Sequence, residues 1–165
     1  TNNNLNKNQM IKKTITSTIG RFFKSESQII FFSKLHKLII KITNGKIGTN
    51  LLGVPILILT TTSSKTGKQY SNPLAYIKYK NGYVCIASFG GSNKHPIWLK
   101  NIEKNSNVLI NINGKISSYT ATIIYEDPLR EKLWKELINI YSGFKKYQEK
   151  TTRKLPIIYF KLSGN

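Results

Sequence analysis

Apolar and β-branched side chains recur along the chain in patterns that predict β-strands. Residues 54–62 form a nearly unbroken run of such side chains, which is typical of a buried strand. Asn81-Gly82 and Asn113-Gly114 are dipeptides that favour tight hairpin turns, so each predicts a pair of antiparallel strands. The other predicted strands are residues 73–79, 83–88, 108–112, 116–124 and 157–162.

Two segments between these strands have the spacing of helices. The first follows Ser92 and has Pro96 in its first turn. The second starts at an Asp127 cap with Pro128 next, and its apolar stripe consists of Leu129, Leu133, Leu137 and Tyr141. About six strands with short hairpins and helices set between them predict an α+β fold built on an antiparallel barrel.

The N-terminal region differs from the rest of the chain. Residues 1–27 are polar and lack the apolar run of a secretory signal, so we expect a mobile tail followed by a single domain over residues 28–165. Between Gln28 and Asn44 the apolar residues are spaced by three and four, and lysines occupy the opposite side. This amphipathic basic helix either packs on the core or lies on an anionic membrane surface. We therefore expect a cytoplasmic protein, either free or peripheral on the inner face of the membrane.

Amino-acid composition and net charge limit the kinds of molecule that this protein can bind. The chain has 165 residues, 26 Lys and Arg against 7 Asp and Glu, and a net charge of +19, of which +14 belongs to residues 1–102. Such a charge fits a phosphate-bearing partner, an anionic membrane or a polyanionic cofactor. Because 23 of the 26 basic residues are lysine and no base-reading module is recognisable, we expect no specific nucleic-acid binding. One cysteine and two distant histidines, His36 and His95, predict no disulfide and no metal site.

Two loops carry residues suited to binding an anionic ligand. Residues 60–68 combine hydroxyl side chains, Gly67 and two lysines in a possible anion cradle, although the spacing of a P-loop is missing. Residues 87–101 contain a strand that ends in Ser88, then Gly90-Gly91, and then the start of a helix whose free N–H groups point at the same place. We interpret His95 in this segment as a structural hydrogen-bonding residue.

The order of several separate motifs resembles a known family. Thr60-Thr61-Thr62 precedes Lys65-Thr66-Gly67, Pro73-Leu74 follows, and the next motifs are residues 87–91 and 95–98 with Asn101. The similarity continues through Leu133-Trp134, residues 141–148 and Ile157-Ile158. From about Leu35 to Leu162, the chain resembles the deazaflavin-dependent nitroreductase family of split β-barrel proteins.

The resemblance implies a split β-barrel and a cofactor, the 8-hydroxy-5-deazaflavin coenzyme F-420, which has a phosphate and an oligoglutamate tail. It implies that the loop matching residues 64–68 holds the phosphate and the tail, that two strand segments line the ring, and that the helix start closes the pocket. The implied cofactor-binding residues are Ser64, Lys65, Thr66, Lys68, Tyr70, Pro73, Leu74, Ala75, Ile86, Ala87, Ser88, Phe89, Ile97, Trp98 and Asn101.

The resemblance also implies an oxidoreductase that transfers a hydride from the reduced cofactor to a flat apolar acceptor, which is a quinone, nitroaromatic or enone. The implied catalytic residues are Ser88, Tyr141 and Tyr147. Tyr141, Phe144 and Tyr147 would line the substrate pocket, and their spacing of three predicts one face of a helical turn. Phe144 has no hydroxyl and cannot donate a proton.

Two residues depart from the pattern of the family that the chain resembles: Tyr70 stands where the family commonly has Arg, and Phe89 stands where some members have a basic residue. They leave two alternatives open. One is FMN as the cofactor, and the other is a barrel that binds a lipid or another apolar anion without catalysis. The sequence predicts no oligomeric state.

Overall fold

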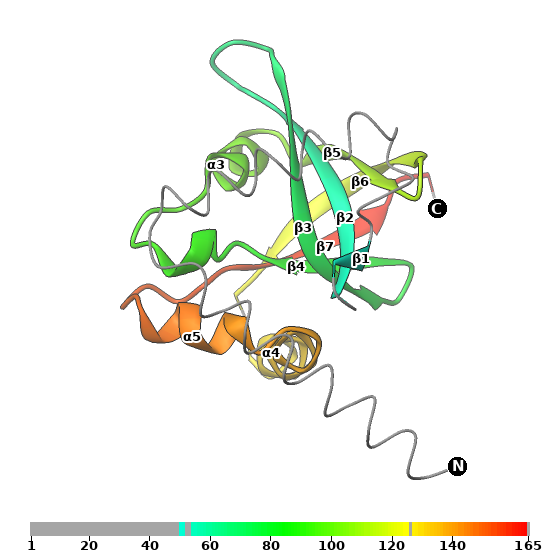
Figure 1. Ribbon diagram of the computed structural model, residues 1–165. Helices are drawn as coiled ribbons and strands as arrows, with labels where there is room; N and C mark the ends of the chain where they lie inside the picture. The colour runs from blue at the N-terminus through cyan, green and yellow to red at the C-terminus, as the bar shows by residue number, and fades with distance from the viewer. Residues whose placement is uncertain (1–49, 52–53, 126, 165) are drawn as a thin grey trace, which may run out of the picture.

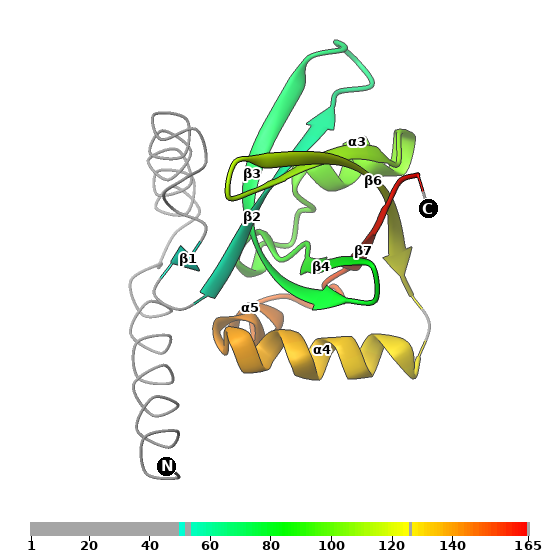
Figure 2. The same ribbon diagram turned by 90° about the vertical axis from the view of Figure 1, so that its right-hand side faces the viewer.

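A closed antiparallel barrel forms the centre of the protein. The computed structural model describes residues 50–51, 54–125 and 127–164. Every strand pairs antiparallel with its neighbours in the order β1-β2-β3-β4-β7-β6-β5, and β2 also pairs with β5, which closes β2 to β7 into a barrel (Figures 1 and 2). The strands are β1 (Asn50–Leu51), β2 (Val54–Thr62), β3 (Gln69–Tyr79), β4 (Gly82–Ile86), β5 (Asn107–Ile112), β6 (Lys115–Ile124) and β7 (Ile157–Leu162). The predicted α+β barrel is confirmed.

The predicted strand bounds are close to those observed. β2 and β7 have the predicted ends, while β3 begins four residues earlier, at Gln69. The first hairpin differs, because Tyr79 pairs with Gly82 and the turn residues are therefore Lys80 and Asn81. Gly82 belongs to the strand, where a Cβ atom would collide with the carbonyl oxygen of Phe160 on β7. Close approach of β7, and not turn geometry, requires this glycine.

Alternate residues of β2 point to opposite sides of the barrel wall and enter two separate cores. Leu57 and Leu59 lie in the barrel interior, whereas Ile56 and Ile58 lie on its outer face. The interior core includes Tyr76, Cys85, Ile110, Tyr119, Ile158, Phe160 and the α3 side chains Trp98, Leu99 and Ile102. The outer core includes Val84, Ile86, Ile157 and the helical or loop side chains Leu133, Leu137, Tyr141, Phe144 and Leu155.

The helices cover opposite sides of the barrel. α3 (Ile97–Lys104) lies on one side, and α4 (Leu129–Ile140) and α5 (Gly143–Glu149) lie on the other (Figure 2). A short 3₁₀ turn, η1 (Phe89–Gly91), follows β4. The prediction that Asp127 caps the second helix is wrong: Pro128 is the N-cap residue without a side-chain cap bond, and Asp127 instead pairs with Lys154 at 3.7 Å.

Two predictions for the N-terminal region fall outside this description. The polar tail of residues 1–27 and the amphipathic helix of residues 28–44 both precede residue 50. Within the described ranges, no helix is long and apolar enough to cross a membrane.

Candidate functional site

The β2–β3 hairpin extends beyond the barrel (Figure 1) and presents the predicted anion-binding loop at its tip. Five backbone N–H groups of this loop bond within the turn. Ser63 donates to the Lys68 carbonyl and Gly67 to the Ser63 carbonyl, at 2.9 Å each. Lys65 and Thr66 donate to Ser63 Oγ at 3.3 Å each, and Lys68 donates to Thr66 Oγ1 at 3.4 Å. The Lys65 and Lys68 side chains are exposed. An anion at this tip would therefore bind mainly to the two ammonium groups, and less to the backbone than the sequence led us to expect.

Strand register divides the predicted ring-lining residues of β3 between two faces. Tyr70 lies opposite Thr61, and Leu74 lies opposite Leu57, so both share the inner side of the wall with buried partners. The side chains of Pro73 and Ala75 point outward, because successive side chains alternate between the two faces of a strand. They therefore lie on the opposite face of the strand from the side chain of Leu74.

A buried hydrogen bond attaches α3 to the base of the hairpin. Asn101 Nδ2 donates to Thr61 Oγ1 at 3.1 Å, and both residues are buried. Ile97 precedes Asn101 by one helical turn, and Tyr70 lies across the sheet from Thr61, so the two residues flank this bond. Tyr70 is 48% exposed and Ile97 is 74% exposed, unlike most large apolar side chains of the described chain. Beside the two lysines, these exposed surfaces suit a ligand that joins a flat ring to an anionic chain.

The loop after β4 has an unusual backbone. Phe89, Gly90 and Gly91 have successive φ values of 45°, 65° and 84°, and Phe89 therefore lies in a region that side chains rarely adopt. A Cβ atom on Gly91 would lie 2.5 Å from the carbonyl oxygen of Tyr147, so α5 packs directly on this loop. Ser88 is half-buried, and its hydroxyl has no hydrogen-bond partner among the described residues. The two residues before Ser88 are buried: Ile86, the last residue of β4, lies in the outer core, and Ala87 lies in the interior core.

Arg153 holds this loop in place, although no sequence motif predicts a role for it. Its Nη2 donates to the Ser88 carbonyl at 2.8 Å, and its Nε donates to the Ser92 carbonyl at 2.8 Å. Both terminal nitrogens also reach the Ala87 carbonyl at 3.3 Å, and Nη1 lies 3.4 Å from His95 Nδ1. Partial burial lowers the pKa of Arg153 below its ordinary value. The only available signal was the rarity of arginine among 23 lysines.

The three predicted substrate-pocket aromatics do form a cluster. The Tyr141 and Tyr147 hydroxyls lie 2.9 Å apart, and the Phe144 ring centroid lies 5.1 Å from that of Tyr141 and 6.3 Å from that of Tyr147. The predicted single helical face is wrong, because α4 ends at Ile140 and α5 begins at Gly143. A side chain on Gly143 would collide with the Tyr141 ring, so this glycine lets Tyr141 fold back against α5.

Burial keeps the hydroxyls of this pair protonated. Desolvation, followed by the influence of Tyr147, raises the pKa of Tyr141 far above its ordinary value. Desolvation also raises the pKa of Tyr147, although the hydrogen bond with Tyr141 opposes that rise. Both groups can donate a hydrogen bond at neutral pH, and neither releases its proton readily.

The outer face of the barrel brings two predicted sets of residues together. Ile86 belongs to the same outer core as Tyr141 and Phe144, and Ala75 packs against that core. Leu74, Ala87 and Trp98 instead face the interior. Tyr70 lies five residues before Ala75 on the same extended strand, so the two residues are about 17 Å apart. A long cofactor could thus place its ring near the aromatic cluster and its tail on the hairpin.

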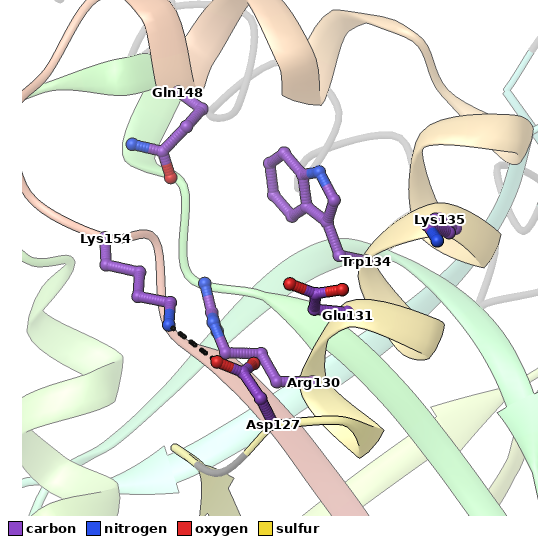
Figure 3. A pocket seen from close by; sticks show the side chains of 7 residues that line it. All are labelled: Asp127, Arg130, Glu131, Trp134, Lys135, Gln148 and Lys154. Atoms are coloured by element: carbon purple, nitrogen blue, oxygen red, sulfur yellow. Dashed lines mark ion pairs between the residues drawn. The ribbon is translucent and has the colours of Figure 1, made fainter.

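A separate cavity of about 450 Å³ lies between α4 and residues 148–154. Figure 3 shows Arg130, Glu131 and Trp134 of α4 on one side and Gln148 and Lys154 on the other. Arg130 is buried, and its Nη2 donates to the Leu155 carbonyl at 2.7 Å. No predicted site residue lines this cavity.

Comparisons with known proteins identify the family and the fold. Residues 32–161 match the family model described as F420H(2)-dependent quinone reductase. The chain is 33% identical over 129 residues to a Mycobacterium tuberculosis protein named F420H(2)-dependent quinone reductase, with 76% of this chain and 86% of that protein covered.

Two solved structures share the fold. One is a structure of an F420-H2 dependent reductase (FDR-A), with 33% identity, a TM-score of 0.60, and coverage of 65% of this chain and 94% of that chain. The other is described as a domain-swapped dimer, with 29% identity, a TM-score of 0.62, and coverage of 83% of this chain and 100% of that chain.

The fold and the comparisons together show that this protein is a split β-barrel oxidoreductase of the class that uses a deazaflavin. Within that class, the chain belongs to the F420H(2)-dependent quinone reductase family. Its cofactor is coenzyme F-420, and the alternative of FMN is not needed. The exposed Lys65 and Lys68 fit the anionic tail of this cofactor, and the exposed Tyr70 and Ile97 offer it apolar surface.

Proposed function

We propose that this protein uses reduced coenzyme F-420 to reduce a quinone, which binds beside Tyr147 on the outer face of the barrel. The observation that carries the proposal is the packing of α5 on the Ser88–Gly91 loop, because it brings the Tyr141–Tyr147 pair to the cofactor loop. When bound, the reduced deazaflavin supplies a hydride from its carbon 5. The quinone accepts that hydride and one proton and becomes a quinol.

Lys65 and Lys68 bind the phosphate and the carboxylates of the tail through their exposed ammonium groups. Screening by salt weakens such contacts, so cofactor affinity should fall as ionic strength rises. Tyr70 presents an exposed aromatic ring and no positive charge. Tyr70 and Ile97 therefore contribute apolar contact to the cofactor, and charge comes from the loop.

Ser88 donates its hydroxyl to the cofactor ring. Arg153 is a positioning residue that acts through the loop. It donates hydrogen bonds to the backbone carbonyls of Ala87, Ser88 and Ser92 and does not contact the reactants. With those carbonyls held, the strained backbone at Phe89 keeps one conformation and the Ser88 side chain keeps its direction.

Tyr147 donates a hydrogen bond to the quinone oxygen, which gains negative charge as the hydride arrives. Tyr147 is more exposed than Tyr141, which lies behind it and fixes its hydroxyl at 2.9 Å. Because burial raises the pKa of both groups, the pair stabilises the developing charge by hydrogen bonding, and water supplies the proton. Flat nitroaromatic and enone acceptors fit the same chemistry, since each also gains negative charge on oxygen.

The test is a fluorescence titration with coenzyme F-420 at low salt, followed by turnover of the reduced cofactor with a quinone. We expect saturable binding and quinone-dependent reappearance of the oxidised cofactor absorbance. Absence of binding at low salt, together with a fatty acid retained on the native protein, would instead favour the non-catalytic lipid binder. Membrane association through residues 28–44 stays a prediction, and flotation of the full chain with anionic liposomes tests it.

A further inference from the structure

A second cavity, of about 410 Å³, opens between the β3–β4 and β5–β6 hairpins. Lys78, Lys80 and Lys115 line it, together with Tyr83 and Tyr119 and the apolar side chains Ile110, Ile112 and Leu162. We infer that this cavity binds a small amphiphilic anion, which is a carboxylate or phosphate attached to an apolar group. The inference is independent of the proposed reductase function.

All the charged side chains that line the cavity are positive. Three lysines line it and no acidic residue does. Among the described residues, the ion pair between Lys and an acidic side chain is the one that joins Lys154 to Asp127. None of the three lysines of the cavity therefore has an acidic partner among those residues. Lys80 Nζ lies over the Tyr79 ring, 5.5 Å from its centroid. Like charges around one cavity repel each other, and a bound anion would relieve that repulsion.

The deeper wall supplies both hydroxyls and apolar surface. The Tyr83 and Tyr119 rings lie 5.6 Å apart, and Tyr119 is buried. Burial, followed by a hydrogen bond with Tyr83, raises the pKa of Tyr119 to about 12, so its hydroxyl stays neutral. Ile112 and Leu162 are half-buried and Ile110 is buried. A charged head at the lysines and an apolar body against these side chains would satisfy both parts of the lining.

The cavity is separate from the proposed cofactor site and lies at the opposite end of β3 from the lysines proposed to bind the tail. Lys68 precedes β3 and Lys78 lies near its other end, and about ten residues of extended strand span roughly 33 Å. None of the residues assigned to cofactor or acceptor binding lines the cavity. Its volume falls in the range of about 300–1,000 Å³ that is usual for small-molecule sites. An anion here would therefore bind without displacing the cofactor.

Three matched probes test the inference on the full chain: decanoate, decanol and inorganic phosphate. Decanoate combines the head and the body, decanol lacks the charge, and phosphate lacks the body. We expect saturable decanoate binding that shifts the methyl NMR signals of Ile112 and Leu162, and binding of either other probe at least about tenfold weaker. Decanoate that binds no better than decanol would overturn the proposal.

Two double variants locate the site. Lys78→Gln with Lys115→Gln should weaken decanoate binding about tenfold, whereas Lys100→Gln with Lys104→Gln removes the same charge from α3 and should leave it unchanged. Equal losses in both variants would mean that only net charge matters, which contradicts a built site. Saturating coenzyme F-420 should leave decanoate binding intact, and competition between them would overturn the placement of the site.

Discussion

The Arg153 guanidinium donates a 2.8 Å hydrogen bond to the carbonyl oxygen of Ser88, a residue 65 positions earlier in the chain. The same side chain bonds to the Ser92 carbonyl at 2.8 Å, so it spans the whole of η1. Gln148 Nε2 donates in turn to the Arg153 carbonyl at 2.9 Å, and Gln148 Oε1 accepts from the Leu155 amide at 3.0 Å. The end of α5 and the loop of residues 88–92 are therefore one connected unit.

Replacement of Arg153 tests this connection. Arg153→Lys keeps the charge but loses the planar fork that reaches the carbonyls of Ala87, Ser88 and Ser92. We therefore expect a loss of about 1–3 kcal/mol of unfolding free energy and a cofactor affinity about tenfold lower. Urea unfolding and cofactor titration measure the two effects. Arg130→Lys is the control, because Arg130 bonds to the Leu155 carbonyl at 2.7 Å and does not contact the loop. Equal losses of cofactor affinity in both variants would contradict the positioning role.

The hairpin lysines should act through charge. Lys65→Gln and Lys68→Gln should each weaken cofactor binding by up to about 1 kcal/mol, or roughly fivefold, and reduce its dependence on salt. Lys132→Gln removes an exposed lysine from α4 and serves as the control. Titration at two ionic strengths makes the comparison, and cofactor affinity that does not change with salt would exclude the ammonium–tail contact.

Substitutions of Tyr141 and Tyr147 should change the rate of quinone reduction without changing the affinity for the cofactor. Tyr147→Phe removes the proposed hydrogen bond to the acceptor and leaves the buried Tyr141 hydroxyl without its 2.9 Å partner. We expect slower quinone reduction, unchanged cofactor affinity and about 1–2 kcal/mol less stability. Tyr141→Phe should cost similar stability with a smaller effect on the rate, and rapid-mixing single turnovers measure both. A larger rate loss for Tyr141→Phe would reverse the two roles.

Tyr119 should make stability sensitive to alkaline pH. Burial raises the pKa of its folded form to about 12, above the ordinary value of 10.0, so the folded state holds the proton more tightly than the unfolded state. Its contribution is complete below pH 10 and is lost as the pH rises from 10 towards 12. Tyr119→Phe should therefore lose less stability than the parent protein over that interval, as measured by urea unfolding. Identical pH profiles would show that Tyr119 is not the responsible group.

Much of the fold followed from short-range patterns. Alternation of apolar residues and two Asn-Gly pairs predicted six barrel strands, because side-chain period and turn preference are local properties. The motif order predicted the family and its cofactor, which the comparisons confirm. The error at the first hairpin arose because Gly82 serves close approach to Phe160, a contact with a strand almost eighty residues later.

Only the tertiary structure decided how the predicted residues are shared among surfaces. Register sends Leu74 into the barrel and leaves Pro73 and Ala75 outside, and the chain reversal at Gly143 folds Tyr141 back onto Tyr147. The partners of Arg153 depend on barrel closure and on the packing of α5 against η1. Local side-chain patterns were enough to predict the six barrel strands and the family. Contacts between residues far apart in the chain established which side chains meet, because packing and strand register are properties of the whole fold.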